Sequence, residues 1–339
     1  MILRGAIIGL GKIAQTGHLP AYGDSRITER AEIVAAVDPS IDARDAGRRL
    51  FPNLRIYETV DQLFAKEKVD FIDITTPPHL HAALIAEGIA RGVHVLCEKP
   101  FAHNLEDAGR TVELLKKHSL VFMPCHQYHL SPIWSAFKHF IEKSDSRAGW
   151  FLQFNIYRTQ ADPGSTHWNS LWRTDQSISG GGILADTGVH YLYLTLWLMG
   201  FPGSIVAKTS RLQLGEGAVE DTAIVVAEFD NGLTEINLTW GADQRANSAR
   251  LVTRQGSVVY DGTTLAQFRN GTKELLQVPD ASDKTQYIGL YVSLFDEFLR
   301  RVETGQPSAA WIDEAFQSVQ LLQACYESAR TSQTIILNQ

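Results

Sequence analysis

The stretch AIIGLGKIA, residues 6–14, decides the fold of this 339-residue chain. An apolar run leads into the pattern GxGxxA, formed by Gly9, Gly11 and Ala14, and a helical pattern follows. At such a junction the first glycine permits a tight turn, the second lets the backbone approach a pyrophosphate, and the alanine allows a helix to pack closely on the strand. A purely structural glycine turn is the alternative. We favour a dinucleotide site, with cofactor contacts expected at Gly9, Leu10, Gly11, Lys12 and Ile13.

The next apolar run, EIVAAVD (residues 32–38), ends in Asp38. A carboxylate at this place accepts hydrogen bonds from the adenosine ribose hydroxyls and repels a 2′-phosphate. The residues that follow, Pro39 and Ser40, are not basic, so the sequence favours NAD over NADP. Arg44 is close enough along the chain to leave NADP open as the second possibility.

Short apolar runs alternate with helical patterns as far as residue 124, which predicts a doubly wound parallel sheet covered by helices, the α/β Rossmann fold. The expected strands lie at residues 4–10, 32–38, 54–58, 69–75, 93–99 and 120–125. Asn104 is a plausible N-cap for the helical pattern that follows it.

Beyond residue 125, strand-like runs between 204 and 278 are joined by turn pairs such as Asn231-Gly232 and Asn270-Gly271, and two helical patterns, at 287–302 and 313–329, close the chain. We therefore expect a dinucleotide-binding domain at 1–124. An α+β domain for substrate binding and oligomerisation, with a large, mainly antiparallel open sheet, is expected at 125–339.

The composition indicates which binding partners and which cellular compartment to expect. A formal charge of −7 gives no electrostatic reason to expect nucleic acid or an anionic membrane, so a small molecule is the expected partner. Three cysteines, Cys97, Cys125 and Cys325, show no CxxC spacing and suggest buried thiols in a reducing compartment. The apolar start of the chain is too short to span a membrane and lacks a signal-peptide cleavage pattern, so we expect a cytoplasmic protein.

Two longer stretches carry a family resemblance. TTPPHLHAALIAEGIARGVHVLCEKP (residues 75–100) and GGGILADTGVH (residues 180–190) strongly resemble the signature of the Gfo/Idh/MocA family, named for glucose-fructose oxidoreductase, inositol dehydrogenase and a rhizopine-catabolism protein. The resemblance extends over the whole chain, as far as CYESARTSQTI (residues 325–335), and says nothing about the substrate. It implies that the cofactor is also contacted by Thr76, Pro77, His81, Glu98, Lys99 and Gln127.

Lys99 is the first residue for which the resemblance implies a catalytic role. The matching lysine of the family touches the substrate hydroxyl and the nicotinamide ribose, and its charge would stabilise alkoxide character as hydride leaves. An ordinary surface lysine is the alternative, which the neighbouring Glu98 and Pro100 argue against. A cis Lys99-Pro100 bond is also expected from the resemblance.

Asp186 and His190 are four residues apart, so on an α-helix they would face the same way. We expect His190 to act as the general base in alcohol oxidation, because its ordinary pKa lies near working pH. Asp186 either orients the imidazole or holds a neighbouring substrate hydroxyl. The glycines at 180–182 would let the start of the helix pass close to a ring system. A hydrogen-bonded core histidine is the alternative for His190.

Several positions depart from the family pattern. Many relatives carry an aspartate where this chain has Tyr193, which leaves the second contact of the histidine open. His129 replaces a frequent arginine, which suggests either a less negatively charged substrate or an unrelated packing change. The expected substrate contacts are Tyr128, His129, Trp172 and Arg173, with Trp168 on the same segment as the last two. No metal is expected, because neither His126 and His129 nor His79 and His81 have further ligands at suitable spacing.

These observations predict an NAD(P)-dependent oxidoreductase acting on a secondary alcohol or ketone of a sugar, cyclitol or sugar derivative. Two alternatives on the same fold are an NAD-dependent non-redox glycosidase or epimerase-type enzyme and a non-catalytic dinucleotide-dependent sensor. The stretch TAIVVAEF (residues 222–229) is apolar on both faces. That pattern predicts a homodimer or homotetramer formed through the second domain's sheet.

Overall fold

The computed structural model describes residues 2–144, 149–163, 171–215, 218–276, 285–306 and 308–337. The chain forms two compact units, each made of several segments. Unit 1 comprises residues 1–127, 163–180 and 287–316, and unit 2 comprises residues 128–162, 181–286 and 317–339. Two later segments, residues 163–180 and 287–316, thus belong to the same compact unit as the first 127 residues.

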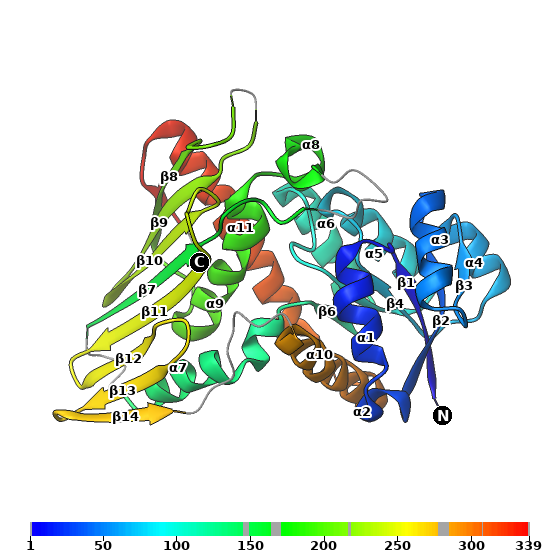
Figure 1. Cartoon of the computed structure of the whole chain (residues 1–339), viewed down its shortest axis with the longest axis horizontal. Helices are drawn as coiled ribbons and strands as arrows, with labels where there is room; N and C mark the ends of the chain where they lie inside the picture. Colours follow the sequence, from blue (N-terminus) through cyan, green and yellow to red (C-terminus); the bar gives the residue numbers. More distant parts are fainter. Residues whose placement is uncertain are drawn as a thin grey trace. The chain divides into compact units, whose positions relative to one another are not determined.

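Unit 1 is built on a six-stranded parallel sheet with the order β3-β2-β1-β4-β5-β6, which confirms the predicted Rossmann fold (Figure 1). The strands are β1 (Leu3–Ile8), β2 (Ala31–Val37), β3 (Arg55–Tyr57), β4 (Phe71–Ile74), β5 (His94–Cys97) and β6 (Phe122–Pro124). Each overlaps one of the expected strand runs. Their carboxyl ends bear the residues from which a dinucleotide site is built in this fold.

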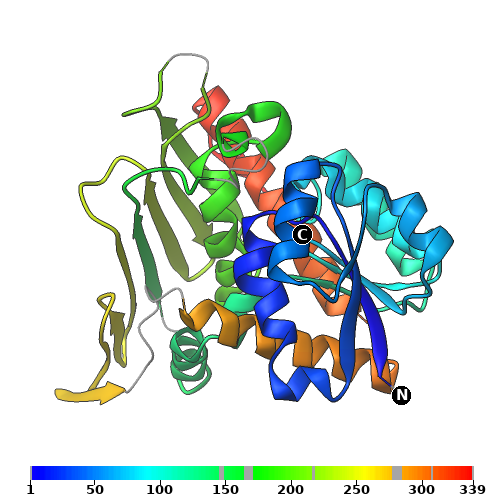
Figure 2. The ribbon, with the colours of Figure 1, turned by 45° about the vertical axis from the view of Figure 1, so that its right-hand side comes forward.

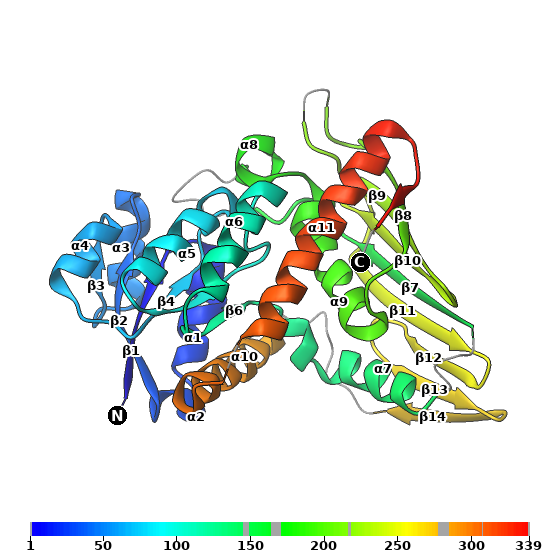
Figure 3. The same cartoon turned by 180° about the vertical axis from the view of Figure 1, so that it is seen from behind.

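The helices of unit 1 lie between these strands along the chain or follow the last of them. They are η1 (Ala14–His18, a π-helix), α1 (Leu19–Tyr22), α2 (Ser25–Thr28), α3 (Ile41–Leu50), α4 (Val60–Lys66), η2 (Pro78–Leu80), α5 (His81–Ala90), α6 (Leu105–Lys116), η4 (Trp172–Thr174), α8 (Gln176–Ser179) and α10 (Thr285–Thr304). α1 lies on one face of the sheet and α5 and α6 lie on the other (Figures 1 and 3). The predicted N-cap is confirmed, because the side chain of Asn104 accepts the backbone N–H of Asp107 at 2.9 Å.

The core of unit 1 joins the N-terminal helices to α10, far along the chain. The ring of Phe295 stacks on Tyr22 at 4.1 Å, and Phe298 meets Phe71 edge-on at 5.5 Å. Figure 2 shows α10, in orange, alongside the blue N-terminal helices. Among the described residues, none of the helices has the length and apolar character that crossing a membrane requires.

Unit 2 is built on a nine-stranded sheet with the order β14-β13-β12-β11-β7-β10-β9-β8-β15 (Figure 1). The strands are β7 (Trp150–Tyr157), β8 (Ser204–Ser210), β9 (Thr222–Phe229), β10 (Gly232–Thr239), β11 (Ala246–Thr253), β12 (Gly256–Tyr260), β13 (Leu265–Arg269), β14 (Thr272–Leu276) and β15 (Ile335–Ile336). The sheet is mainly antiparallel, as predicted, but β7 pairs with β10 in parallel. Asn270 and Gly271 form the expected hairpin turn, with φ of 50° and 77°.

Helices cover one face of this sheet: α7 (Pro132–Glu142), η5 (Leu184–Gly188), α9 (Val189–Met199) and the later part of α11 (Ala309–Thr331). Side chains of β7 and α9, including Phe154 and Leu192, share one buried apolar cluster. No helix in the described part of the chain covers the opposite face. There Ile224 of β9 is 49% exposed, whereas its neighbours Ala223 and Val225 are buried on the helix side.

Candidate active site

The turn between β1 and η1 carries the glycine pattern, and its two glycines are required for different reasons. Gly9 has φ of +104°, and a Cβ there would lie 3.0 Å from the backbone nitrogen of Thr76. A Cβ built on Gly11 would meet no atom of the described chain within 4 Å. Contacts among the described residues therefore do not explain Gly11, whereas a pyrophosphate lying against the backbone would.

Asp38 follows β2 and is held against the glycine turn by backbone donors. Its Oδ2 accepts the N–H of Leu10 and its Oδ1 accepts the N–H of Ser40, both at 2.8 Å. The guanidinium of Arg44 donates to the carbonyl oxygens of Asp38 at 2.8 Å and Pro39 at 2.7 Å. Because Arg44 is bound to the backbone, the arrangement offers a ribose a carboxylate and favours NAD over NADP.

Two side-chain atoms after β4 and β6 are buried with no hydrogen-bond partner among the described residues. They are Oγ1 of Thr76 and Oε1 of Gln127. A buried polar atom left unpaired costs about 1–3 kcal/mol, so such atoms are normally paired with a ligand, water or protein group. Both residues were predicted to contact the cofactor, and both offer a vacant hydrogen-bonding atom that fits a polar ligand.

His81 links two of the predicted cofactor segments. Its Nε2 lies 2.7 Å from the carbonyl oxygen of Thr76, and its Nδ1 lies 2.7 Å from the carbonyl oxygen of Pro100. Pro77, between Thr76 and η2, is in an extended conformation. His81 therefore fixes the turn after β4 to the turn after β5, and its side chain is fully buried.

Glu98 and Lys99 follow β5 directly, and the Lys99-Pro100 bond is cis, as expected. The carboxylate of Glu98 turns inward. Its Oε2 accepts the backbone N–H of Lys99 at 3.1 Å, and its Oε1 accepts the hydroxyl of Tyr291 at 2.7 Å. Glu98 thus fixes the backbone from which the Lys99 side chain departs.

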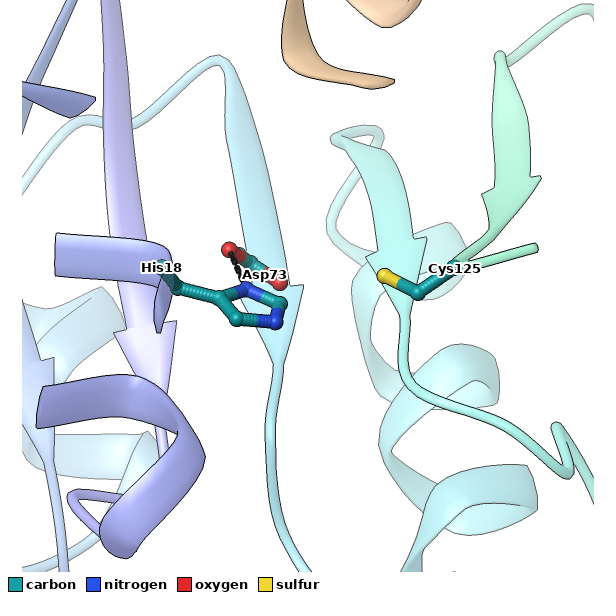
Figure 4. A group of neighbouring side chains, drawn as sticks. All are labelled: His18, Asp73 and Cys125. Carbon is teal, nitrogen blue, oxygen red and sulfur yellow. Dashed lines mark hydrogen bonds and ion pairs between the residues drawn. The ribbon is translucent and has the colours of Figure 1, made fainter. Parts of the chain in front are cut away.

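A second partner of Glu98 is His18, which sequence reasoning missed. His18 Nε2 lies 3.0 Å from Glu98 Oε1. Its Nδ1 lies 2.7 Å from Asp73 Oδ2 (Figure 4). Burial works to lower the pKa of His18, but the charge of Asp73 and the hydrogen bonds to Asp73 and Glu98 raise it to about 9. Burial opposes ionisation of Glu98 as well, yet the hydrogen bond and charge of His18 lower the pKa of Glu98 to about 2. The group is therefore an imidazolium between two carboxylates.

Cys125 lies beside this group, and one ligand atom each from His18, Asp73 and Cys125 fall within 4.8 Å of one another (Figure 4). Those residue types suit a metal. Both ring nitrogens of His18 already bond carboxylates, however, and burial raises the pKa of the Cys125 thiol. We interpret the group as a hydrogen-bond network. All three cysteines are buried and free, as predicted.

In unit 2 the structure gives the glycines before η5 a different role from the one expected. A Cβ on Gly181 would lie 1.8 Å from the hydroxyl of Tyr326, and a Cβ on Gly182 would lie 1.8 Å from the carbonyl oxygen of Glu220. These glycines are therefore required by contacts inside unit 2. The approach of a ligand ring is not needed to explain them.

Glu220, which the sequence did not reveal, caps η5. Its carboxylate accepts the N–H groups of Gly182 at 2.9 Å and Leu184 at 3.1 Å, and the hydroxyl of Tyr326 at 2.9 Å. Burial raises the pKa of Glu220 in spite of these bonds. The signal available in the sequence was an acid just before the apolar run at residues 222–229, since a carboxylate buried beside a strand needs partners.

Asp186 lies in η5, which is a π-helix, and His190 lies in α9. We expected one α-helix to carry both residues, and this is wrong. A π-helix bonds residue i to i+5, so the α-helical spacing of four residues does not apply between Asp186 and His190. Oδ2 of Asp186 accepts the hydroxyl of Thr187 at 3.1 Å. The Nδ1 of His190 lies 3.1 Å from the hydroxyl oxygen of Tyr193, which supplies the contact that the sequence left open.

The expected substrate residues fall in both units. In unit 2, the ring of Tyr128 stacks on His190 at 4.5 Å, and that of His129 stacks on Trp197 at 4.8 Å. In unit 1, the guanidinium of Arg173 lies 4.3 Å from the ring centre of Trp172. Trp168 lies outside the described residues.

Comparison with known proteins places these observations in a family. Residues 3–126 match the family model described as "Oxidoreductase family, NAD-binding Rossmann fold", and residues 153–337 match "Oxidoreductase family, C-terminal alpha/beta domain". Unit 1 is thus built on an NAD-binding Rossmann fold of the oxidoreductase class. The chain belongs to the Gfo/Idh/MocA family, as the sequence motifs suggested.

Individual relatives are distant. An uncharacterized oxidoreductase of Schizosaccharomyces pombe is 27% identical over 67% of this chain, and the match spans 60% of that protein. The levoglucosan dehydrogenase of Pseudarthrobacter phenanthrenivorans is 26% identical over 76% of this chain and 70% of its own length. A levoglucosan dehydrogenase solved with NADH and L-sorbose is 19% identical, covers 100% of both chains and has a TM-score of 0.85, which shows that the fold is shared.

Proposed function

We propose that this protein is an NAD-dependent dehydrogenase or reductase that transfers a hydride between nicotinamide C4 and a secondary alcohol or ketone carbon of a sugar, cyclitol or sugar derivative. The observation that carries the proposal is the open space at Gly11. No contact within the described chain requires a glycine there, whereas a dinucleotide pyrophosphate against the backbone would. Levoglucosan dehydrogenase and D-glucoside 3-dehydrogenase among the relatives support a sugar-like substrate.

The residues present fit NAD. The backbone of Gly9 to Ile13 would hold the pyrophosphate, and the Asp38 carboxylate would accept the ribose hydroxyls. Thr76 Oγ1 and Gln127 Oε1 would gain the partners that they lack within the described chain. When bound, NAD supplies the hydride acceptor at C4 of the nicotinamide.

Three side chains carry the proposed chemistry. We assign to the ammonium of Lys99 a hydrogen bond to the substrate oxygen, where its charge stabilises alkoxide character. We assign to Nε2 of His190 the proton of the substrate hydroxyl, since its Nδ1 contacts Tyr193. Asp186 accepts a hydrogen bond from a neighbouring substrate hydroxyl. In ketone reduction the same groups act in reverse.

Aromatic side chains provide the substrate surface in this proposal. Sugar rings pack on aromatic faces through their apolar C–H groups. The rings of Tyr128 and Trp172 would provide such faces. His129, in a stack with Trp197, would add a polar edge without a fixed charge, and Arg173 would reach hydroxyls. These aromatic and polar side chains suit a polyol or a sugar ring.

The open face of the unit 2 sheet supports the proposal of a homodimer or homotetramer. Large apolar side chains stand exposed on this sheet across several neighbouring strands. They are Tyr157, Val206, Ile224, Leu233, Val252 and Phe268. Covering such a face with a second copy of the same sheet would bury them symmetrically.

Absorbance at 340 nm, followed with NAD and a panel of sugars and cyclitols, tests the function. Net NADH formation with at least one compound supports a dehydrogenase. Product formation without net NADH would instead indicate the non-redox alternative. Ligands that raise the melting temperature without any turnover would indicate a sensor, because binding to the native state raises apparent stability whether or not chemistry follows.

A further inference from the structure

The contacts of Tyr193 are unusual for a fully buried tyrosine. Its side chain is 0% exposed, its hydroxyl oxygen accepts the backbone N–H of Tyr128 at 3.2 Å, and the same oxygen lies 3.1 Å from Nδ1 of His190. One phenol therefore ties the imidazole to the start of unit 2's first segment. His190 and Tyr193 belong to α9, and Tyr128 belongs to η3 (Gln127–Leu130). All three of these residues lie in unit 2.

Aromatic rings fix the plane of the imidazole from two sides. Tyr128 stacks on His190 with an interplanar angle of 21°, and the ring of Tyr193 lies edge-on to it at 5.6 Å and 69°. Tyr193 is held in turn by the edge of His129 at 5.2 Å. The rings of Tyr128 and Tyr193 thus give the imidazole of His190 a defined orientation.

The titratable groups around His190 come from three neighbouring elements. Tyr128 and His129 lie on η3, Tyr193 lies on α9 itself, and Asp186 lies on η5. From α7, Lys138 donates its Nζ to the carbonyl oxygen of Trp197 at 2.7 Å, two helical turns beyond the histidine. The hydroxyl of Tyr193 lies 3.1 Å from Nδ1 of His190.

We propose that Tyr193 is a positioning residue for His190, holding Nδ1 with an uncharged phenol where many catalytic histidines have a carboxylate. The proposal rests on the proposed function, in which Nε2 of His190 exchanges the substrate proton. A carboxylate only accepts hydrogen bonds, so it fixes one tautomer and stabilises the imidazolium. A phenol orients the ring without that fixed negative charge, so the proton at His190 is held less firmly.

The test compares Tyr193→Phe, which keeps the ring and removes the hydroxyl, with Tyr193→Asp, which supplies a carboxylate. Histidine NMR titration of each protein, with the His190 signal assigned from its loss in His190→Gln, requires no substrate. We expect Tyr193→Asp to move the midpoint of the His190 titration upward by about one pH unit. The acid limb of the kcat/KM profile for oxidation should move with it.

We expect Tyr193→Phe to lower kcat about tenfold or more with little change in KM, because a misplaced proton acceptor slows the chemical step and not binding. Tyr260→Phe is the matched control: this buried hydroxyl donates to the carbonyl oxygen of Gly262 at 2.8 Å and should leave the kinetics unchanged.

Unchanged kcat in a folded Tyr193→Phe, or an unmoved His190 midpoint in a folded Tyr193→Asp, would overturn the proposal. If Tyr193→Asp does not fold, the kcat of the isosteric Tyr193→Phe still tests the proposal. If the wild-type enzyme turns over no compound, the proposed function fails on its own, while the NMR titration still reports on the Tyr193 contact.

Discussion

Nε2 of His18 lies 3.0 Å from Oε1 of Glu98, which joins a side chain after the glycine turn to the residue that precedes Lys99. The link spans 80 residues of sequence and neither side chain is exposed. It connects the predicted pyrophosphate turn to the predicted catalytic lysine through one ion pair. Asp73 completes it from the opposite side of the imidazole.

Replacing His18 by leucine should destabilise unit 1 strongly. The change leaves Asp73 and Glu98 buried without their cationic partner, and breaking a buried pair in this way costs about 3–5 kcal/mol. Urea unfolding measures the loss. His118→Leu, the same change at an exposed site, is the control and should stay within about 0.5 kcal/mol of wild type. An equally small effect at His18 would show that the ion pair contributes little.

The same network predicts a pH dependence of stability. The pKa of His18 is about 9 in the folded state and exceeds the ordinary 6.5 of histidine. The contribution of His18 to the stability of the protein is therefore fully present below pH 6.5 and is lost as the pH rises through 9. Within that window stability should fall by up to about 1.4 kcal/mol per pH unit. Glu98, with a depressed pKa, contributes above pH 4.5 and loses this as the pH falls towards 2.

The check is urea unfolding at several pH values between 6.5 and 9, for wild type and His18→Leu. The fall in stability should be clearly steeper in the wild-type protein. Identical slopes in the two proteins would mean that His18 is not protonated in the folded state.

Gly11→Ala should separate cofactor binding from folding. The position has open space around it and lies outside the left-handed region, so the free energy of unfolding should change by less than about 0.5 kcal/mol. A methyl group against the pyrophosphate should weaken NAD binding at least about tenfold, measured by titration calorimetry. Gly9→Ala, at φ of +104°, should instead lower stability. Unchanged NAD affinity in Gly11→Ala would remove the main support for the proposed site.

Gly182→Ala, in contrast to Gly11→Ala, should lower the stability of the protein. A Cβ there would lie 1.8 Å from a backbone oxygen of Glu220, so the start of η5 must move, at a cost of about 1–3 kcal/mol or more. Gly109→Ala, at an uncrowded position in α6, should stabilise the protein by about 0.5–1 kcal/mol. Thermal unfolding compares the two. A stable Gly182→Ala protein would show that the Glu220 contact does not define the start of η5.

The open sheet face predicts the oligomeric state. Sedimentation velocity at micromolar concentration should show a dimer or tetramer for wild type and a smaller species for Ile224→Lys, because the lysine replaces an exposed apolar side chain of the open face by a charge. Leu50→Lys, a matched change at an exposed site on α3 of unit 1, should leave the assembly intact. A monomeric wild-type protein would refute the proposed interface.

The sequence predicted what depends on local patterns. The six parallel strands, the Asn104 cap, the Asn270-Gly271 turn and the glycine junction at Gly9 all follow from residues within a few positions of one another. The family motifs then placed Lys99 and His190. These features are set by backbone conformation and by periodicity, which a single sequence displays directly.

What the sequence did not predict depends on long-range contacts. Glu220 meets Gly182 across 38 residues, and Asp73 meets His18 across 55. Asp73 did carry a signal, since an acid within the apolar run of β4 needs a buried partner, but nothing local names His18. The π-helical turns of η1 and η5 were also missed, because their periodicity differs little from that of an α-helix over one turn.

In the proposed function, Lys99 acts in an NAD-dependent hydride transfer on a polyol. The most direct test is the rate of NADH formation at 340 nm by wild type and Lys99→Met, with the best compound from the sugar and cyclitol panel and with NAD affinity measured in parallel. We predict a loss of at least about 100-fold in kcat for Lys99→Met, with NAD affinity changed by only a small factor. An undiminished rate in the variant, or the absence of NADH from a wild-type reaction that consumes its substrate, would contradict the account.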